Sequence, residues 1–368
     1  MPEQIPIGLY THINFAFGTI NPFTYVFEAN DEEGKLMYER LIALKRRDRN
    51  LKIFLAIGGW TFNDPGRTHK VFSNLVNSEG NQQKFLVSLM SFMALHKFDG
   101  LDLDWEYPVD KDRGGMESDY ENFPKFMSNL KDLMEDGDRG LTITLPASYW
   151  YLQFFDIKKL ERTVDFFNIM SYDLHGVWDQ HANWTKPYLN AHTNLTEIDS
   201  ALDLFWRNDI DPDKIVMGLG FYGRAFMAKI ASCVEPGCQF NGPANAGKCS
   251  AEKGILLNSE IEGEMQSITS PWPTCSAATL QRVLWIKPRM WASGSRRRTN
   301  NVAGPTAEKD VPRAGRLFLA VILGHERASK CLTRRAAVVT AGTFFAALQT
   351  RTPPCVDFTA IMVEIARR

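Results

Sequence analysis

The chain has 368 residues, of which 44% are hydrophobic and 23% are charged, and its formal net charge is −1. That length suffices for one large domain or two ordinary ones. The balanced charge excludes a strongly basic or acidic protein, so composition points to no nucleic-acid or membrane partner. No apolar stretch reaches the roughly 18 residues of a membrane span. The N-terminus also lacks the basic region and long apolar run of a signal peptide.

Strands and helices alternate along the first 226 residues. Apolar, β-branched runs predict strands, and the segments between them place apolar residues at helical spacing. The predicted strands are 11–20, 52–60, 98–108, 141–148, 164–176 and 214–226. The predicted helices are 34–47, 81–96, 119–136 and one that begins near Thr196, whose hydroxyl is expected to cap it with Asp199. This alternation favours an α/β fold with a parallel sheet covered by helices.

The acidic residues Asp99, Asp102, Asp104 and Glu106 interrupt the apolar segment FDGLDLDWEYP at 98–108. Side chains alternate along a strand, so the last three share one face, while Leu101, Leu103 and Trp105 share the other. The apolar face suits packing against helices, so the acids on the opposite face are expected to line the interior of the barrel. The other predicted strands also end in residues that are unusual for a buried strand. A (β/α)8 barrel keeps its active site at the carboxyl ends of its strands.

Neighbouring acids on this face are about 6.5–7 Å apart along the strand. Carboxyls at that spacing share protons, so that one ionises easily while the next stays protonated near neutral pH. Glu106, nearest the open end, is then the predicted proton donor. The alternative is a set of structural acids that bind backbone amides or a cation. A cation needs converging oxygen ligands, whereas one rigid strand presents them in a line.

The six cysteines all follow residue 230, and their spacing matches no zinc pattern. The segment CVEPGC…GKC, with Cys233, Cys238 and Cys249, favours a loop stapled by a disulfide, and its pairing is left open. N-glycosylation acceptor sequences begin at Asn183 and Asn194 and agree with a secretory history.

The segment DGLDLDWEYP (99–108) is similar to the catalytic signature of glycoside hydrolase family 18, the chitinases, whose pattern is Asp-x-x-Asp-x-Asp-x-Glu. LAIGGW (55–60), MSYDLHG (170–176) and GFYGRAF (220–226) match other motifs of this family in the same order. CQFNGPANAGKCSAEKGIL (238–256) resembles the fungal subgroup related to killer-toxin α-subunits. The resemblance covers residues 5 to about 262. It implies a (β/α)8 barrel, an extracellular location and no metal or organic cofactor.

The resemblance also implies a role for each matching residue. Glu106 would protonate the glycosidic oxygen, while the N-acetyl group of the substrate acts as the nucleophile. Asp104 would orient that amide with Asp102 sharing a proton behind it, and Tyr172 would bond the N-acetyl oxygen. The other expected substrate contacts are Trp60, Tyr107, Met170, Asp173, Tyr222 and Arg224, and the supporting motif positions are Asp99, Gly58 and Gly59.

Some of these residues also have a purely structural interpretation. Trp60 can pack at the barrel rim, and this is the expected role of Trp178 and Trp184; His175 is expected to be structural as well. Tyr172 and Asp173 fall on opposite faces of a regular strand, so the strand end must twist to bring both into one site.

The sequence departs from the family pattern at both ends. No strand is predicted before residue 11, and no eighth strand ending in tryptophan is visible, so the barrel is expected to be incomplete. Only strands two to seven are recognisable, and segments 11–20 and 214–226 should have unpaired outer edges. From residue 281 onward, 16 basic and 5 acidic residues give a net charge of +11, whereas the first 280 residues, with 26 basic and 38 acidic, give −12.

We therefore divide the chain into a partial catalytic barrel at 1–226, a cysteine-containing insertion at 227–268 and an unassigned basic tail at 269–368. The tail is interpreted as an out-of-frame or mis-spliced translation. The predicted protein is a monomeric, endo-acting chitinase that hydrolyses chitin or chito-oligosaccharides with retention. A chitin-binding lectin would typically lack the acid at Glu106. An endo-N-acetylglucosaminidase acting on N-glycans and an inactive fragment remain alternatives.

Overall fold

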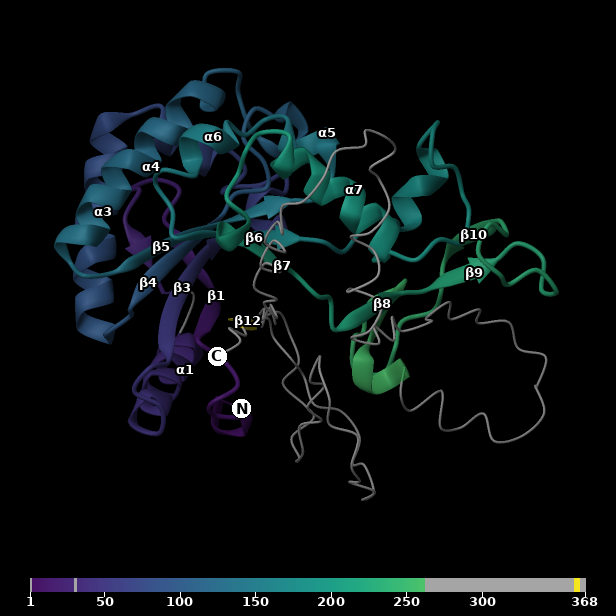
Figure 1. Cartoon of the computed structure of the whole chain (residues 1–368), viewed down its shortest axis with the longest axis horizontal. Helices are drawn as coiled ribbons and strands as arrows, with labels where there is room; N and C mark the ends of the chain where they lie inside the picture. The colour runs from purple at the N-terminus through teal and green to yellow at the C-terminus, as the bar shows by residue number, and fades with distance from the viewer. Residues whose placement is uncertain (1, 30–31, 262–360, 365–368) are drawn as a thin grey trace, which may run out of the picture.

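The computed structural model describes residues 2–29, 32–261 and 361–364. Its centre is a mostly parallel sheet with the strand order β12-β1-β3-β4-β5-β6-β7 (Figure 1). These strands are β1 (His12–Ile20), β3 (Lys52–Gly58), β4 (Gly100–Asp104), β5 (Gly140–Pro146), β6 (Phe166–Met170), β7 (Ile215–Met217) and β12 (Ile361–Glu364), and β2 (Phe27–Glu28) pairs with β1. All six predicted strands are therefore present, although those predicted at 98–108, 164–176 and 214–226 are much shorter than predicted.

Helices connect the strands and cover the sheet, with α3, α4 and α6 side by side along its outer face (Figure 1). The helices are α1 (Glu32–Ala43), α2 (Val71–Val76), α3 (Glu79–His96), α4 (Asp119–Asp136), α5 (Tyr149–Leu152), α6 (Ile157–Leu160) and α7 (Leu195–Trp206). Three short 3-10 turns lie near the carboxyl ends of strands: η3 (Trp60–Asn63), η4 (Lys111–Arg113) and η5 (Val177–His181). No helix of the described residues is long and apolar enough to cross a membrane.

Helix α7 begins differently from the prediction. Asn194, not Thr196, is its N-cap, because the Asn194 side chain accepts a hydrogen bond from the backbone N–H of Glu197 at 3.0 Å. Asparagine is among the strongest N-cap residues, and the Asn194 Nδ2 group also donates to the Glu197 carboxylate. The predicted partner Asp199 takes no part in this cap.

The alternation predicted for the acid-bearing strand is confirmed. Leu101, Leu103 and Trp105 are each at most 1% exposed. The Trp105 ring stacks on Phe72 of α2 with a centroid distance of 5.4 Å, and it meets Phe123 of α4 edge-on at 5.2 Å. This face of β4 therefore packs against helices, and the acids on the other face are turned to the interior side of the sheet.

Asp99 anchors the amino-terminal end of β4, opposite the end that carries Glu106. One Asp99 carboxylate oxygen accepts from Lys45 Nζ at 2.5 Å, and the other accepts from the backbone N–H of Ile53 at 2.8 Å. Its backbone carbonyl accepts from Gly140 N at 2.9 Å. Asp99 thus joins β3, β4 and β5 and helps to fix the register of the sheet, but it lies outside the site.

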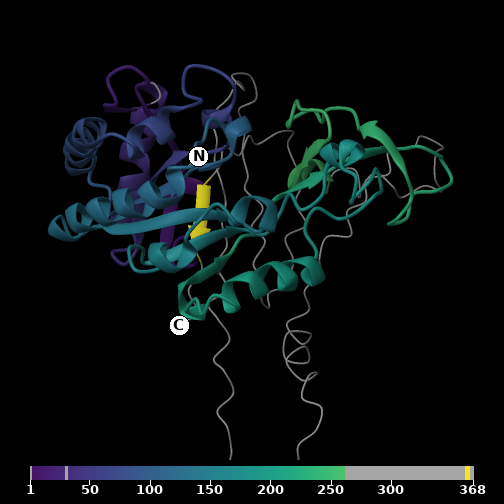
Figure 2. The same ribbon diagram turned by 90° about the horizontal axis from the view of Figure 1, so that it is seen from above.

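The sheet is open in the part of the chain that the structure describes. No pairing joins β7 to β12, and no closed barrel forms there. The unpaired edge predicted for segment 11–20 is wrong, because β12 pairs antiparallel with β1 from His12↔Glu364 to Phe15↔Ile361, beside it in Figure 2. Any extended segment can satisfy the N–H and C=O groups of a free edge, and hydrophobic periodicity does not predict such pairing. The rest of the predicted tail lies outside the described residues.

The strand predicted at 214–226 divides into separate pieces. After β7 the chain leaves the central sheet, β8 (Tyr222–Arg224) pairs with β11 (Ile255–Leu257), and β9 (Phe226–Ala228) pairs with β10 (Phe240–Pro243). A small apolar cluster around Phe226 and Phe240 supports this second region. The predicted stapled loop is confirmed by the Cys233–Cys238 disulfide.

Gly58 gives a first prediction, because it lies where β3 approaches the end of β4. Its φ is +115°, and a Cβ atom there would lie 1.9 Å from the carbonyl oxygen of Asp104. Gly58→Ala should therefore lower the free energy of unfolding by at least about 2 kcal/mol in urea denaturation. Gly80→Ala in α3 is the matched control, because no heavy atom lies within 4 Å of that Cβ position. It should leave stability unchanged or raise it, and equal losses in both variants would contradict the steric explanation.

Candidate active site

Three acids follow one another at the carboxyl end of β4. Asp102 is fully buried, Asp104 is 2% exposed and Glu106 is 7% exposed. Asp102 and Asp104 stand at alternate positions of the strand, and Glu106 follows beyond its last residue. The predicted alignment of the three carboxyls is therefore present in the fold, but their surroundings differ.

Asp102 is held by side chains from β5, the adjacent strand, and from β6, the strand beyond it. Its Oδ1 accepts from Thr142 Oγ1 at 2.6 Å and from Asn168 Nδ2 at 2.9 Å, while Oδ2 accepts from Thr144 Oγ1 at 2.9 Å. Burial raises the pKa of Asp102, and these three hydrogen bonds oppose that rise. Within the described residues its hydrogen bonds go to β5 and β6 and none goes to Asp104.

Asp104 lacks such support. Its Oδ1 is buried and has no hydrogen-bond partner among the described residues. Burial, followed by the negative charges of Glu106 and Asp102, raises the pKa of Asp104 well above its usual value. Burial and the two neighbouring acids therefore both disfavour the ionised form of Asp104.

Glu106 sits between these extremes. Burial raises its pKa to about 7, although the Tyr107 hydroxyl and the positive charge of Arg113 act in the opposite direction. Tyr107 Oη donates to Glu106 Oε2 at 2.9 Å. A carboxyl with a pKa near 7 can both give and accept a proton at neutral pH, which is what general acid–base chemistry requires.

Tyr107 does not present the free ring expected for stacking on a sugar. It is only 5% exposed, and its ring stacks on Tyr151 of α5 at a centroid distance of 4.1 Å. Burial and the neighbouring Glu106 charge raise the pKa of Tyr107 well above its usual value, so its hydroxyl remains a donor. The buried hydroxyl therefore acts on the acid itself, and the predicted stacking surface is not available.

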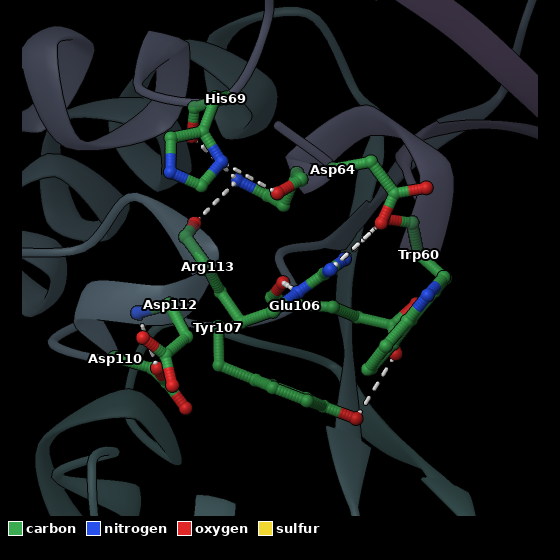
Figure 3. Close-up of polar contacts among 9 residues, drawn as sticks. Trp60, Asp64, His69, Glu106, Tyr107, Asp110, Asp112 and Arg113 are labelled. Carbon is green, nitrogen blue, oxygen red and sulfur yellow. Dashed lines mark hydrogen bonds and ion pairs between the residues drawn. The ribbon is translucent and has the colours of Figure 1, made fainter. Parts of the chain in front are cut away.

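Trp60 remains available for a ligand. The residue is 49% exposed, and the Arg113 guanidinium lies over its ring at 3.7 Å from the centroid (Figure 3). Gly59, just before it, donates its backbone N–H to the Asp104 carbonyl at 2.9 Å and has a φ of +83°. The two-glycine turn thus fixes the start of η3 against the end of β4.

The ends of β6 and β8 contribute a second polar group. Asp173 has a φ of +56°, so regular alternation has ended and Tyr172 and Asp173 need not point to opposite sides. Arg224 Nε donates to Asp173 Oδ1 at 2.8 Å and Nη2 donates to Oδ2 at 2.7 Å. Although burial opposes it, hydrogen bonds from His192 and Arg224 hold the pKa of Asp173 below its usual range. Asp173 is therefore a permanent anion.

Tyr172 and Tyr222 line the space beside these charges. Their ring centroids are 6.1 Å apart, and Tyr172 is 8% exposed. Burial and then the charge of Asp104 raise the pKa of Tyr172 well above its usual value, which keeps its hydroxyl protonated. Met170, at the end of β6, packs against the main core.

Two features of the site were not predicted from the sequence. Arg113 is buried in a loop and contacts Glu106, but a single buried arginine leaves no periodic signal. Trp184 was expected to pack at the rim, yet it is 71% exposed, and its ring lies 5.7 Å from that of Trp150, itself 56% exposed. Exposed tryptophans following β5 and η5 could have been proposed as a binding surface from their position after strands.

In the described part of the chain, no cluster of three or more His, Cys, Asp or Glu side chains is arranged to hold a metal ion.

An α/β sheet with buried acids at the carboxyl end of one strand is compatible with a glycoside hydrolase. Residues 2–303 match the family described as glycosyl hydrolases family 18, and the chain belongs to this family. The match extends beyond residue 262, where the recognised sequence motifs end.

Individual relatives agree with this assignment. The chain is 32% identical over 273 residues to the secreted chitinase LysM12 of Penicillium expansum, covering 70% of this chain and 18% of that protein. It is 32% identical over 266 residues to the killer toxin subunits alpha/beta of Kluyveromyces lactis, covering 71% and 22%. The predicted relation to the killer-toxin subgroup is thereby confirmed, although the chain spans less than a quarter of either relative.

A solved structure also resembles the fold. The Ostrinia furnacalis Group IV chitinase in complex with allosamidin aligns with a TM-score of 0.64 and 28% identity, over 72% of each chain. The mostly parallel sheet with flanking helices is therefore shared with a chitinase structure.

His175, in the motif that follows β6, has a structural role. Its Nδ1 lies 2.8 Å from Asp179 of η5, and its Nε2 lies 2.8 Å from Glu197 of α7. The hydrogen bonds to Asp179 and Glu197 raise the pKa of His175 to about 9 against the effect of burial. The imidazolium therefore clasps the loop after β6 to the start of α7.

This clasp predicts a pH-dependent stability. Because the pKa is raised from 6.5 to about 9, the stabilisation is complete below pH 6.5 and is lost as pH rises through about 9. His175→Gln should cost on the order of 1 kcal/mol at pH 6, since Glu197 is 42% exposed and solvent screens its charge. The difference from the wild type should vanish at high pH in denaturation curves. His181→Gln, at an exposed histidine of η5, is the control, and a difference that persists at high pH would contradict the clasp.

Proposed function

We propose that the chain is a chitinase that hydrolyses β-1,4 linkages between N-acetylglucosamine units with retention, assisted by the substrate. The observation that carries the proposal is the position of Glu106, a buried acid with a pKa of about 7 at the carboxyl end of β4. Asp104 and Asp102 precede it on the same face of the strand. Membership of a family with chitinase relatives supports the same reaction.

In the first step, protonated Glu106 gives its proton to the glycosidic oxygen. As the bond from C1 to that oxygen breaks, the carbonyl oxygen of the substrate's own N-acetyl group attacks C1 and forms an oxazolinium ion. Ionised Glu106 then takes a proton from water, whose oxygen attacks C1 and reopens the ring. Two inversions at C1 give net retention, and Glu106 regains its proton.

Asp104 is proposed to orient the N-acetyl group. Its buried Oδ1 has no partner among the described residues, and the amide N–H of the substrate is a donor suited to it. A carboxyl oxygen at the amide nitrogen turns the acetyl carbonyl toward C1 and stabilises the positive charge that develops on the ring being formed. Asp102, fixed by three donors, supports Asp104 from behind.

The remaining predicted residues are proposed to hold the sugar. The Tyr172 hydroxyl, protonated at working pH, would donate to the N-acetyl oxygen. Met170, Asp173, Tyr222 and Arg224 would form the walls of this pocket, and the exposed ring of Trp60 would stack on a sugar. Tyr107 has a different proposed role, because its buried hydroxyl binds Glu106 Oε2.

The finer architecture and location belong to the same proposal. The six parallel strands correspond to strands two to seven of an incomplete (β/α)8 barrel, followed by the cysteine-containing insertion. Extracellular action is supported by the Cys233–Cys238 disulfide, which persists in oxidising compartments, and by a relative named as a secreted chitinase. A chitin-binding lectin is not favoured, since binding alone has no use for an acid with a pKa near 7.

A direct test incubates the purified full chain with oligomers of N-acetylglucosamine and follows the products by NMR. Release of shorter oligomers as the β-anomer supports retaining hydrolysis. Allosamidin, the compound bound in the Ostrinia furnacalis structure, is a probe for the same site. Allosamidin binding without any cleavage would replace the enzyme proposal with a binding protein.

The role of Glu106 gives the third prediction. Glu106→Gln keeps the shape of the side chain but removes the proton, so turnover should fall by about 10²–10⁴-fold. In the wild type, kcat/KM should decline as pH rises through about 7, because the acid must be protonated to act. Binding of chitin oligomers, measured by calorimetry, should survive the substitution. Retained turnover in this variant would overturn the assignment of the acid.

Asp104 gives the fourth prediction. Asp104→Asn removes a carboxyl whose titration is coupled to that of Glu106, so the pH–rate profile should change in shape as well as in height. Two coupled ionisations in the wild type should become one in the variant. Glu106 remains in place, and a profile that is lower but otherwise unchanged would show that the acids titrate independently.

A further inference from the structure

Arg113 is a buried cation that reaches back to the catalytic strand from the loop that follows it. The residue ends η4 and is 7% exposed. Its Nε donates to the backbone carbonyl of Glu106 at 3.0 Å, and its Nη1 donates to Asp64 Oδ1 at 2.8 Å (Figure 3). Its Nη2 donates to the backbone carbonyl of Trp60. One planar group therefore binds the segments that follow β3 and β4.

A simple ion pair does not account for this burial. Moving a guanidinium out of water costs several kcal/mol unless partners compensate. The carboxylate that binds Arg113 belongs to Asp64, whose side chain is 46% exposed, so solvent weakens that attraction. The other two hydrogen bonds go to carbonyls at Glu106 and Trp60, and the guanidinium also covers the Trp60 ring at 3.7 Å.

The surrounding loops are shaped to hold Arg113 in this place. Gly114, the next residue, has a φ of +78°, and a Cβ atom there would lie 2.0 Å from the carbonyl oxygen of His69. Asn63 Nδ2 donates to the carbonyls of His69 and Arg113 at 3.2 and 3.3 Å. Asp110 caps η4 by accepting from Asp112 N at 2.9 Å (Figure 3). These contacts lock the two loops together around the arginine.

We propose that Arg113 is a positioning residue for Glu106, which fixes the backbone of the acid relative to the Trp60 ring and places a permanent positive charge beside the carboxyl. Asp64 opposes that charge from the solvent side. This inference rests on the proposed function, since it assigns the arrangement to the acid of that reaction.

The charges around Glu106 predict opposite effects for the two members of the ion pair. The titratable and charged groups that act on it or on its direct neighbours are Asp64, Asp102, Asp104, Tyr107, Arg113, Tyr151, Tyr172, Asp173 and Arg224. Burial raises the pKa of Glu106 to about 7; Arg113 lowers it, whereas Asp64 raises it. Loss of Arg113 should therefore raise this pKa, and loss of Asp64 should lower it.

The pH dependence of kcat/KM tests this sign. With a fluorogenic glycoside of N,N′-diacetylchitobiose, Arg113→Gln should move the alkaline limb up by about half a unit to one unit, and Asp64→Asn should move it down. Arg113→Lys keeps the positive charge but loses the several N–H donors of the planar guanidinium. The alkaline limb of its kcat/KM profile should therefore stay near that of the wild type, while kcat falls by about 10–100-fold. Lys111→Gln, an exposed lysine in the same turn, is the matched control and should change neither.

A second measurement does not depend on turnover. NMR of isotopically labelled glutamate side chains, with the Glu106 signal assigned from Glu106→Gln, follows the acid directly in the full chain. Opposite displacements of the Glu106 pKa in Arg113→Gln and Asp64→Asn support the proposal even if no substrate is cleaved, in which case only the proposed function fails. If Arg113→Gln does not fold, Asp64→Asn alone tests the predicted direction of the change in the Glu106 pKa. An unchanged Glu106 pKa in Asp64→Asn, or shifts in the same direction in both variants, would overturn it.

Discussion

A buried carboxylate in the middle of the sheet needs hydrogen-bond donors, and Asp102 receives them from the adjacent strand β5 and from β6 beyond it. Its two carboxylate oxygens accept hydrogen bonds from Thr142 and Thr144 of β5 and from Asn168 of β6. These bonds satisfy a charge that would otherwise cost several kcal/mol to bury, and they fix β4 relative to β5 and β6. Because Asp104 and Glu106 follow on the same strand, their positions depend on this anchoring.

The three acids are buried to a similar extent, so burial alone does not give them different chemistry. The number of hydrogen-bond donors around each acid is what distinguishes them. Asp102 accepts three hydrogen bonds and Asp104 Oδ1 has no partner among the described residues, while Glu106 has the Tyr107 hydroxyl and the nearby charge of Arg113. The environments of the three acids therefore differ along one strand, and Glu106, the last of them, has a pKa of about 7. Environments that push neighbouring pKa values apart are a common way to divide acid–base roles.

The parts of this arrangement that follow from local sequence could be predicted, and the parts that depend on distant segments could not. Alternation along β4 places Asp102 and Trp105 on opposite faces whatever lies around them. In contrast, the pairing of β12 with β1 joins segments about 350 residues apart, which no local pattern encodes. The burial of Tyr107 is set by Tyr151 on another element, and hydrophobicity gave no signal that its ring would be covered.

The site therefore has two physical layers with different tolerance for change. Residues within the sheet are closely packed, as Gly58 is against the Asp104 carbonyl, and they hold the hydrogen-bond donors of Asp102 in place. Residues in the loops after β3 and β4 lie nearer to solvent and adjust the final acid. Arg113 and Asp64 carry opposite charges at unequal exposure, so a substitution there can alter the acidity of Glu106 without disturbing the hydrogen bonds of Asp102. Under the proposed function, strand positions would preserve the reaction while loop positions would tune the pH at which it proceeds.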